Sequence, residues 1–240
     1  MRIAVLSDIH SAAEPFAKAL DAARSAGFDL LVINGDLFTY GVEPEACLAL
    51  LHDALATDVA ILIEGNHDRL YRDMEEAKFS YLDALPEWIR ESVLWTFARL
   101  ETNWGSGLPW RADWSRDDLL IAHANPHGAN DWRYLRSDAD FTAAVAALEA
   151  RGFRHGVFGH VHRPRHHAAP QGITIDVVGS LGQPREPYGR PQWMMIDYRS
   201  GGLETTVHQV EFDTHHHIAK LQSAGLTGAT AAKLGSFFLC

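Results

Sequence analysis

Short apolar runs alternate with helical patterns along the first half of the chain. The runs lie at residues 3–6, 30–33, 59–63, 119–121 and 157–158, each bounded by turn or polar residues. Such runs are typical of buried strands. Between the first three, apolar residues recur at three- and four-residue spacing over 16–26 and 44–56, and Pro44 suits the first turn of a helix. The pattern predicts a βαβαβ succession.

The second half adds further strands and helices. Segments 172–178, 192–197 and 204–210 are β-prone and separated by turn residues, which predicts neighbouring strands of a second sheet. We expect a layered α/β sandwich over residues 1–213, with a partly helical cap over about 70–117. A helical pattern returns from 214 and predicts a C-terminal helical appendage over 214–240.

Composition limits the class of protein. The 240 residues, 47% hydrophobic, suffice for one full core, and no apolar run approaches the roughly 20 residues of a membrane helix. The first run ends in Ser7 and Asp8 without a cleavage site, so we read it as a strand and not as a signal peptide. Cys47 lies in a helical pattern and Cys240 ends the chain. We therefore expect no disulfide and a cytoplasmic location.

Charge and histidine content change this picture further. The formal charge of -10 and the lack of a Lys/Arg run argue against stable nucleic-acid binding. The 14 histidines are an excess of the side chain that binds metals most often. Their positions decide whether that excess matters.

The apolar runs end in residues that can bind metal. In open α/β sheets the carboxyl ends of the strands line the binding crevice, so these residues are expected to converge. Residues two apart in an extended segment project to one side, so each Asp-x-His or His-x-His pair can chelate. The candidate ligands are Asp8, His10, Asp36, Asn66, His123, His160 and His162.

The donor set favours particular metals and a particular substrate. Mixed oxygen and nitrogen donors suit Mn best, with Fe, Zn, Co or Ni as alternatives, whereas Ca and Mg prefer oxygen alone. Two divalent cations bring about +4 against roughly -2 from Asp8 and Asp36. The centre would therefore attract phosphate. Two ions about 3.5–4 Å apart would activate a bridging water and bind the phosphoryl oxygens.

The ordered motifs resemble those of the calcineurin-like metallophosphoesterase superfamily over about residues 1–210. They are D-x-H at 8–10, G-D at 35–36, G-N-H-D at 65–68, His123, and G-H-x-H at 159–162. The resemblance implies a four-layer αββα sandwich of two mixed sheets flanked by helices. It also implies that Asp8, His10, Asp36 and His162 hold one metal, while Asp36, Asn66, His123 and His160 hold the other. Asp36 would bridge the two ions.

The same resemblance proposes a catalytic residue, and positions near the candidate ligands propose residues for substrate binding. His67 matches the non-ligand histidine that contacts the phosphoryl group or protonates the leaving oxygen, which makes it the candidate general acid. Asp68 either orients that imidazole or shapes the turn. Asn66, His127 and Arg185 are candidates for substrate binding, with plain surface positions as the alternative for His127 and Arg185.

Finer similarity points to a branch of the superfamily. Residues 35–41 followed by Pro44, and residues 179–185, resemble small bacterial and archaeal phosphodiesterases and relatives of diadenosine tetraphosphatase. We expect hydrolysis of phosphomonoesters or phosphodiesters by a bimetal-bound hydroxide. Dinucleoside polyphosphate hydrolysis is an alternative. A serine/threonine phosphoprotein phosphatase is disfavoured because Thr39-Tyr40-Gly41 replaces Asp-Arg-Gly. A non-catalytic scaffold is disfavoured because His67 and every ligand are present.

Other conspicuous residues fit ordinary structural roles. His166-His167 and His215-His216-His217 lie in polar segments, and we interpret them as solvated surface rather than metal sites. Six of the seven tryptophans fall between Trp88 and Trp132. They could form an aromatic wall for a substrate, but we favour ordinary packing of the cap against the sandwich.

Overall fold

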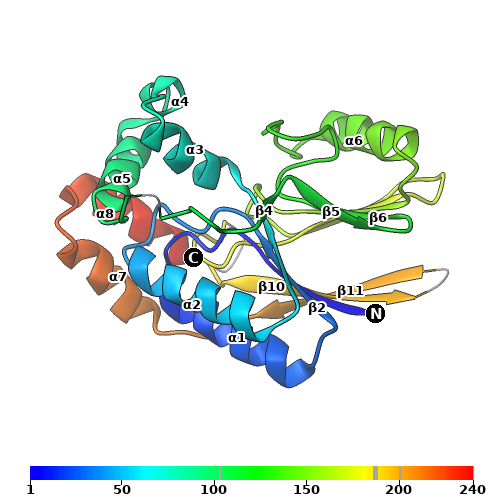
Figure 1. Cartoon of the computed structure of the whole chain (residues 1–240), viewed down its shortest axis with the longest axis horizontal. Helices are drawn as coiled ribbons and strands as arrows, with labels where there is room; N and C mark the ends of the chain where they lie inside the picture. The colour runs from blue at the N-terminus through cyan, green and yellow to red at the C-terminus, as the bar shows by residue number, and fades with distance from the viewer. Residues whose placement is uncertain (103, 186–188, 200–201, 240) are drawn as a thin grey trace.

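Two sheets lie between layers of helices. The structure, a computed structural model, describes residues 1–102, 104–185, 189–199 and 202–239. Its six-stranded sheet has the order β11-β10-β1-β2-β3-β4, and its five-stranded sheet has the order β5-β6-β7-β9-β8. Both sheets mix parallel and antiparallel pairs. Helices α1 and α2 cover one outer face and α6 covers the other (Figure 1). The predicted four-layer αββα sandwich is confirmed.

The first sheet contains the predicted βαβαβ unit. Its strands and connecting helices are β1 (Arg2–Leu6), α1 (Ala13–Ala26), β2 (Leu30–Asn34), α2 (Pro44–Thr57), β3 (Ala60–Ile63), β4 (Trp110–Arg111), β10 (Gln192–Arg199) and β11 (Gly202–Gln209). Strands β1, β2 and β3 are parallel, as crossover helices require. The prediction that residues 192–197 and 204–210 belong to a second sheet was wrong, because β10 and β11 lie in the same sheet as β1. Strand β10 pairs antiparallel with β1, and both of its faces are buried, because Met194 and Ile196 join the core between the sheets and Trp193 and Met195 join the core with α1 and α2.

The second sheet supplies the other half of the sandwich. Its elements are β5 (Asp113–Arg116), β6 (Leu119–Ala122), α6 (Asp138–Ala150), β7 (His155–Phe158), β8 (Arg165–Ala168) and β9 (Thr174–Val177). Helix α6 was not predicted. It begins after Ser137, whose Oγ accepts a hydrogen bond from the N–H of Asp140 while the Asp140 carboxylate accepts from the N–H of Ser137. This capping box starts a helix that packs its Phe141 and Leu148 against the sheet.

The core between the sheets positions the strand ends. Val32 of the first sheet and Ile121 and Val157 of the second belong to one fully buried cluster. Burying each such side chain stabilises the fold by about 1.5–3 kcal/mol. Because the two sheets pack through these residues, the loops that follow β1, β2, β6 and β7 meet at one edge of the sandwich.

Further helices lie in the segment where a partly helical cap was expected and at the C-terminal end. They are α3 (Asn66–Glu75), α4 (Ser80–Asp83), α5 (Glu87–Phe97), α7 (Thr214–Ser223), α8 (Gly228–Gly235) and the 3-10 turn Ser236–Phe238. The C-terminal helices pack on the cap, where the indole Nε1 of Trp95 donates to the carbonyl of Ala224 at 2.8 Å. The division of the chain at residue 213 stays a prediction.

Two further expectations concern thiols and membranes. Cys47 is buried in α2 with a free thiol, and Cys240 lies outside the described residues. Within the described ranges, no helix is both long and apolar enough to cross a membrane.

Candidate metal centre

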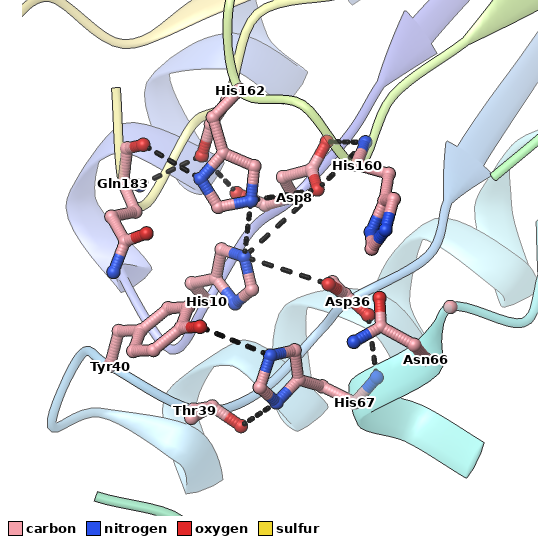
Figure 2. A network of polar contacts seen from close by, with 12 residues as sticks. Asp8, His10, Asp36, Thr39, Tyr40, Asn66, His67, His160, His162 and Gln183 are labelled. Carbon is pink, nitrogen blue, oxygen red and sulfur yellow. Dashed lines mark hydrogen bonds and ion pairs between the residues drawn. The ribbon is translucent and has the colours of Figure 1, made fainter. Parts of the chain in front are cut away.

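The structure brings all seven predicted ligands to one edge of the sandwich. Asp8 and His10 follow β1, Asp36 follows β2, Asn66 begins α3 directly after β3, His123 follows β6, and His160 and His162 follow β7. Each of these side chains is buried. Figure 2 shows six of them pointing toward a common space between the loops.

The ligand atoms form two groups that share one carboxylate. Asp8, His10, Asp36 and His162 place one atom each within 4.8 Å of one another, and so do Asp36, His123 and His160. The Nε2 of His123 lies 3.3 Å from the amide oxygen of Asn66, which places Asn66 beside the second group. The described residues therefore form two adjacent candidate cation sites joined by Asp36.

Histidine tautomers show that the first group suits a cation. The Nδ1 atoms of His10 and His162 lie 2.9 Å from the carbonyl oxygens of Phe38 and Gln183. Both Nδ1 atoms must donate, because a carbonyl only accepts. In the neutral rings both Nε2 atoms carry lone pairs, yet they face each other at 3.1 Å, and the Nε2 of His162 also lies 3.1 Å from Oδ1 of Asp8. Such a set of acceptors needs a proton or a shared cation among them.

The same argument from the ring nitrogens applies to His123 in the second group. The Nδ1 of His123 donates to the carbonyl of Asn34 at 2.8 Å. Its Nε2 lone pair then points toward oxygen atoms, with Oδ2 of Asp36 at 3.5 Å. Such an arrangement of acceptors needs a proton or a metal ion among them.

Ionisation of the site supports metal binding. Burial lowers the pKa of His10 well below its usual value and lowers the pKa of His160 to about 3, so both imidazoles are neutral at pH 7. Burial also acts against protonation of His123, but the adjacent Asp36 carboxylate raises the pKa of His123 to about 10. A divalent cation would take the place of that proton.

The backbone at the site is strained in a way that is common at functional sites. Five ligand residues adopt the left-handed region, with φ of 55° at Asp8, 47° at His10, 55° at Asp36, 65° at His160 and 62° at His162. Each such residue costs on the order of 1–3 kcal/mol and persists only where its surroundings enforce it. Here the N–H of Asp8 donates to Gly35 and the N–H of His10 to Asp36.

Glycine is required next to this backbone. A Cβ atom at Gly65 would collide with the backbone N and the carboxylate of Asp36. A Cβ atom at Gly159 would collide with Ser7 Oγ and the Asp8 carboxylate. The glycines in the two motifs therefore allow the loops to approach the ligands closely.

His67 lies beside the centre and is held at both ring nitrogens. Its Nδ1 lies 3.0 Å from Oγ1 of Thr39, and its Nε2 lies 3.2 Å from the hydroxyl of Tyr40 (Figure 2). Its backbone N–H donates to Asp36 Oδ1 at 2.8 Å. The His67 side chain thus has a fixed position next to the bridging carboxylate without being one of the grouped ligands.

Asp68 faces the backbone instead of the imidazole. Its carboxylate accepts from the N–H groups of Asp36 at 2.7 Å, Leu37 at 2.9 Å and Gly65 at 2.9 Å. These three bonds tie the loop after β2 to the loop after β3. Of the two roles that the sequence allowed for Asp68, the contacts favour the structural one.

The two remaining candidates for substrate binding differ in position. Arg185 donates its backbone N–H to the carbonyl of His162 at 3.3 Å and its guanidinium to Oε1 of Gln183. It therefore lies next to the centre. His127 donates its backbone N–H to Asn125 at 2.9 Å. Among the contacts of the described residues, none joins His127 to a ligand of the centre.

The residues of the two histidine clusters differ in exposure. His166 is exposed and contacts Asp176 at 2.8 Å, and neither cluster belongs to a candidate metal group among the described residues. The expectation of a solvated surface was wrong for His217, which is 3% exposed. Its ring packs against Phe212 and Phe238 because helical spacing in α7 turns it inward.

The tryptophans of the cap are chiefly packing residues. Trp104 is buried in the core under α3. Trp88, in contrast, stacks on Tyr40 with ring centroids 5.6 Å apart, and Phe237 lies beside Trp88 at 6.1 Å. An aromatic path therefore connects the C-terminal turn to the hydroxyl that contacts His67.

Three site residues were not assigned roles from sequence. Thr39 and Tyr40 contact His67, and their position just after the Gly-Asp motif was an available signal. The ring of Tyr134 stacks on His160 with centroids 4.1 Å apart. It comes from the irregular segment after β6, and no pattern in the sequence marks it.

Comparisons with known proteins show the family and the fold. A sequence model of the family described as calcineurin-like phosphoesterase matches residues 1–164. An uncharacterized protein of Methanocaldococcus jannaschii is 25% identical over 224 residues, which cover 88% of each chain. The fold is similar to that of a metallophosphoesterase from Sphaerobacter thermophilus, with TM-score 0.77, 20% identity and coverage of 99% of this chain and 100% of the other. A hypothetical protein from Pyrococcus horikoshii OT3 gives TM-score 0.82 at 15% identity, with 97% of each chain covered.

Proposed function

The chain belongs to the calcineurin-like phosphoesterase family, and on that premise we propose that it hydrolyses phosphomonoesters or phosphodiesters at a centre of two divalent metal ions. The observation that carries the proposal is the pair of Nε2 atoms of His10 and His162, which face each other at 3.1 Å with both Nδ1 atoms already donating. That arrangement fits a cation. Two such sites side by side fit a phosphoryl group, which carries several oxygens to bind.

The ligand groups assign residues to each ion. Asp8, His10, Asp36 and His162 would hold one, and Asp36, Asn66, His123 and His160 would hold the other. Manganese is the favoured metal, with Fe, Zn, Co or Ni as alternatives, because the donors mix carboxylate, amide and imidazole. When bound, the ions polarise the phosphoryl group and lower the pKa of a coordinated water.

His67 is the proposed general acid. Thr39 orients the ring through Nδ1, and Nε2, which contacts the hydroxyl of Tyr40, would donate a proton to the leaving oxygen when substrate is bound. Burial of the ring lowers its pKa, and the surrounding carboxylates and bound ions determine when it is protonated. Asp68 supports this arrangement indirectly, since it holds the loops that carry Asp36 and His67.

The direct test is metal-dependent hydrolysis. The chain is stripped of metal with a chelator, dialysed, re-supplied with Mn²⁺, and assayed with p-nitrophenyl phosphate, its bis ester and, in parallel, diadenosine tetraphosphate. We expect turnover of an ester only after metal is restored, and its loss in His10→Ala but not in His52→Ala, an exposed histidine of α2. Selective turnover of the dinucleotide would identify a dinucleoside polyphosphate hydrolase. Equal rates with and without metal would contradict the proposal.

A further inference from the structure

An arginine-lined cavity of about 550 Å³ lies beside the metal centre. The described lining residues include four arginines and no carboxylate: Arg136, Arg163, Arg165 and Arg185, with Leu135, Val161 and Pro164. A cavity of this size is large enough for a small ligand. The gathering of cationic side chains is notable because the chain as a whole has a formal charge of -10.

The cavity and the metal centre share a wall. Val161 lies between the ligands His160 and His162, and Arg163 directly follows His162. Arg185 reaches the same loop, because its N–H donates to the carbonyl of His162 at 3.3 Å. A ligand in the cavity would therefore contact the loop that carries His160 and His162.

The guanidinium groups are positioned by stacking. Arg136 lies 3.8 Å from the ring centroid of Tyr134, whose ring also stacks on His160. Arg165 lies over Phe141 at 4.2 Å, and Arg185 donates to Oε1 of Gln183. Stacked arginines lose little freedom on binding, and their planar donors match the oxygens of a phosphate.

The charges of the cavity suit an anion. Arg165 pairs with Asp138 at 2.8 Å, but the side chain of Asp138 is 93% exposed. Such an exposed pair is weak and neutralises little of the charge of Arg165. Like charges around one cavity repel each other, and a bound anion with charge of about -2 would relieve that repulsion.

We propose that this cavity is a second phosphate subsite, which binds a phosphoryl group of the substrate that is not cleaved while the metal centre binds the one that is. The inference rests on the proposed function and specifies its substrate class, namely compounds that carry two or more phosphoryl groups. A monophosphate would fill the metal centre alone and would bind more weakly.

The test compares competitors that differ in one phosphoryl group. Hydrolysis of p-nitrophenyl phosphate by the Mn²⁺-loaded full chain is inhibited with adenosine 3′,5′-bisphosphate and with each of the two adenosine monophosphates. We expect competitive inhibition, with an inhibition constant for the bisphosphate at least about tenfold below that of either monophosphate. In Arg136→Gln/Arg165→Gln, this advantage should fall to about twofold or less, whereas inhibition by the monophosphates stays the same.

Controls separate the subsite from the catalytic centre. Both substituted arginines are exposed, and thermal melting checks that the double variant is folded. Arg116→Gln, at an exposed position in β5, should keep the full advantage of the bisphosphate. Equal inhibition by bisphosphate and monophosphates in the unchanged chain, or non-competitive inhibition by the bisphosphate, would overturn the proposal.

Failure of the proposed function is distinguishable from failure of the subsite. If no ester is hydrolysed with any metal, calorimetric titration of the bisphosphate into the unchanged chain and the double variant still tests the cavity. Tighter binding to the unchanged chain by about tenfold supports the subsite, and equal binding contradicts it.

Discussion

The Oγ1 atom of Thr39 lies 3.0 Å from Nδ1 of His67 and 2.8 Å from the hydroxyl of Tyr71. A neutral hydroxyl network thus orients the proposed general acid. Thr39 and Tyr71 are both buried, so water cannot easily replace a lost partner. The ring of His67 depends on Thr39 for its orientation.

Replacing Thr39 with Ala should therefore impair turnover without loss of metal. We expect kcat to fall by about tenfold, since a mispositioned acid donates less efficiently, while KM and metal content stay close to those of the unchanged chain. Thr39→Ser retains the hydroxyl and should restore most of kcat. Steady-state kinetics with elemental analysis measure both quantities, and an unchanged kcat in Thr39→Ala would remove Thr39 from the mechanism.

Removal of the acid itself should have a larger effect. In His67→Ala, kcat is expected to fall by roughly 10²- to 10⁴-fold, which is the usual contribution of a positioned acid or base. The metal content should be retained, because His67 belongs to neither ligand group among the described residues. Esters with a good leaving group, such as p-nitrophenyl phosphate, need less protonation and should lose less than alkyl esters. Loss of both metals in this variant would assign His67 to the ligand shell instead.

Asp36 is the residue on which both ion sites depend. Its Oδ2 lies 3.7 Å from Nε2 of His10 and 3.5 Å from Nε2 of His123. Asp36→Asn keeps the shape and the Oδ1 acceptor of the His67 N–H, but it removes the negative charge between the ions. We expect metal affinity to weaken by more than the roughly 10- to 100-fold seen when outer contacts are lost. Calorimetric titration measures the metal affinity, and the exposed Asp53→Asn serves as the control. Unchanged affinity in Asp36→Asn would show that Asp36 does not bridge the two ion sites.

Ligand positions were predictable because of where they occur in the strand pattern. Asp8, Asp36 and His160 each come within two residues of the end of a buried apolar strand, and parallel strand ends meet at one edge. Local order along the chain was therefore enough to assemble the candidate metal centre, without any knowledge of the sheet's full topology.

Features that depend on contacts between distant segments were not predictable in the same way. The pairing of β10 with β1 joins residues that are almost 200 positions apart, and apolar alternation does not identify a partner strand. The arginine cavity likewise combines Arg136, Arg163 and Arg185 from three loops. Helix α6 had a local signal, Ser137 followed by Asp140, but its Ala-rich stretch lacks a strong amphipathic period.

One residue of α5, Glu91, should stabilise the C-terminal helices by capping the N-terminal end of α8. The Glu91 carboxylate accepts hydrogen bonds from the N–H and Oγ1 of Thr227 and from Oγ1 of Thr230, at the beginning of α8. Glu91→Ala removes these acceptors, and we expect a loss of about 1–2 kcal/mol in the free energy of unfolding. Urea denaturation measures the change. Glu149→Ala, exposed in the last turn of α6, should change the free energy of unfolding by less than about 0.5 kcal/mol. An equal loss in Glu91→Ala and Glu149→Ala would contradict the capping role of Glu91.

His217 predicts how stability depends on pH. Its ring lies 4.5 Å from that of Phe238, its Nε2 has no hydrogen-bond partner among the described residues, and burial lowers its pKa to about 4. The unfolded chain has the ordinary value of about 6.5, so below that pH the unfolded state binds more protons than the folded state. The stabilisation is therefore complete above about pH 6.5 and is lost progressively as the pH falls toward 4.

At pH 5 this single group should lower the free energy of unfolding by about 2 kcal/mol relative to pH 7.5. His217→Phe keeps the aromatic contacts but cannot titrate, so its loss of stability between these two pH values should be smaller than that of the unchanged chain by about the same amount. Urea unfolding at both pH values gives the comparison. His216→Gln, exposed one residue earlier in α7, should retain the full pH dependence. If His217→Phe and the unchanged chain lose equal stability between the two pH values, the buried ring is not the group that senses pH.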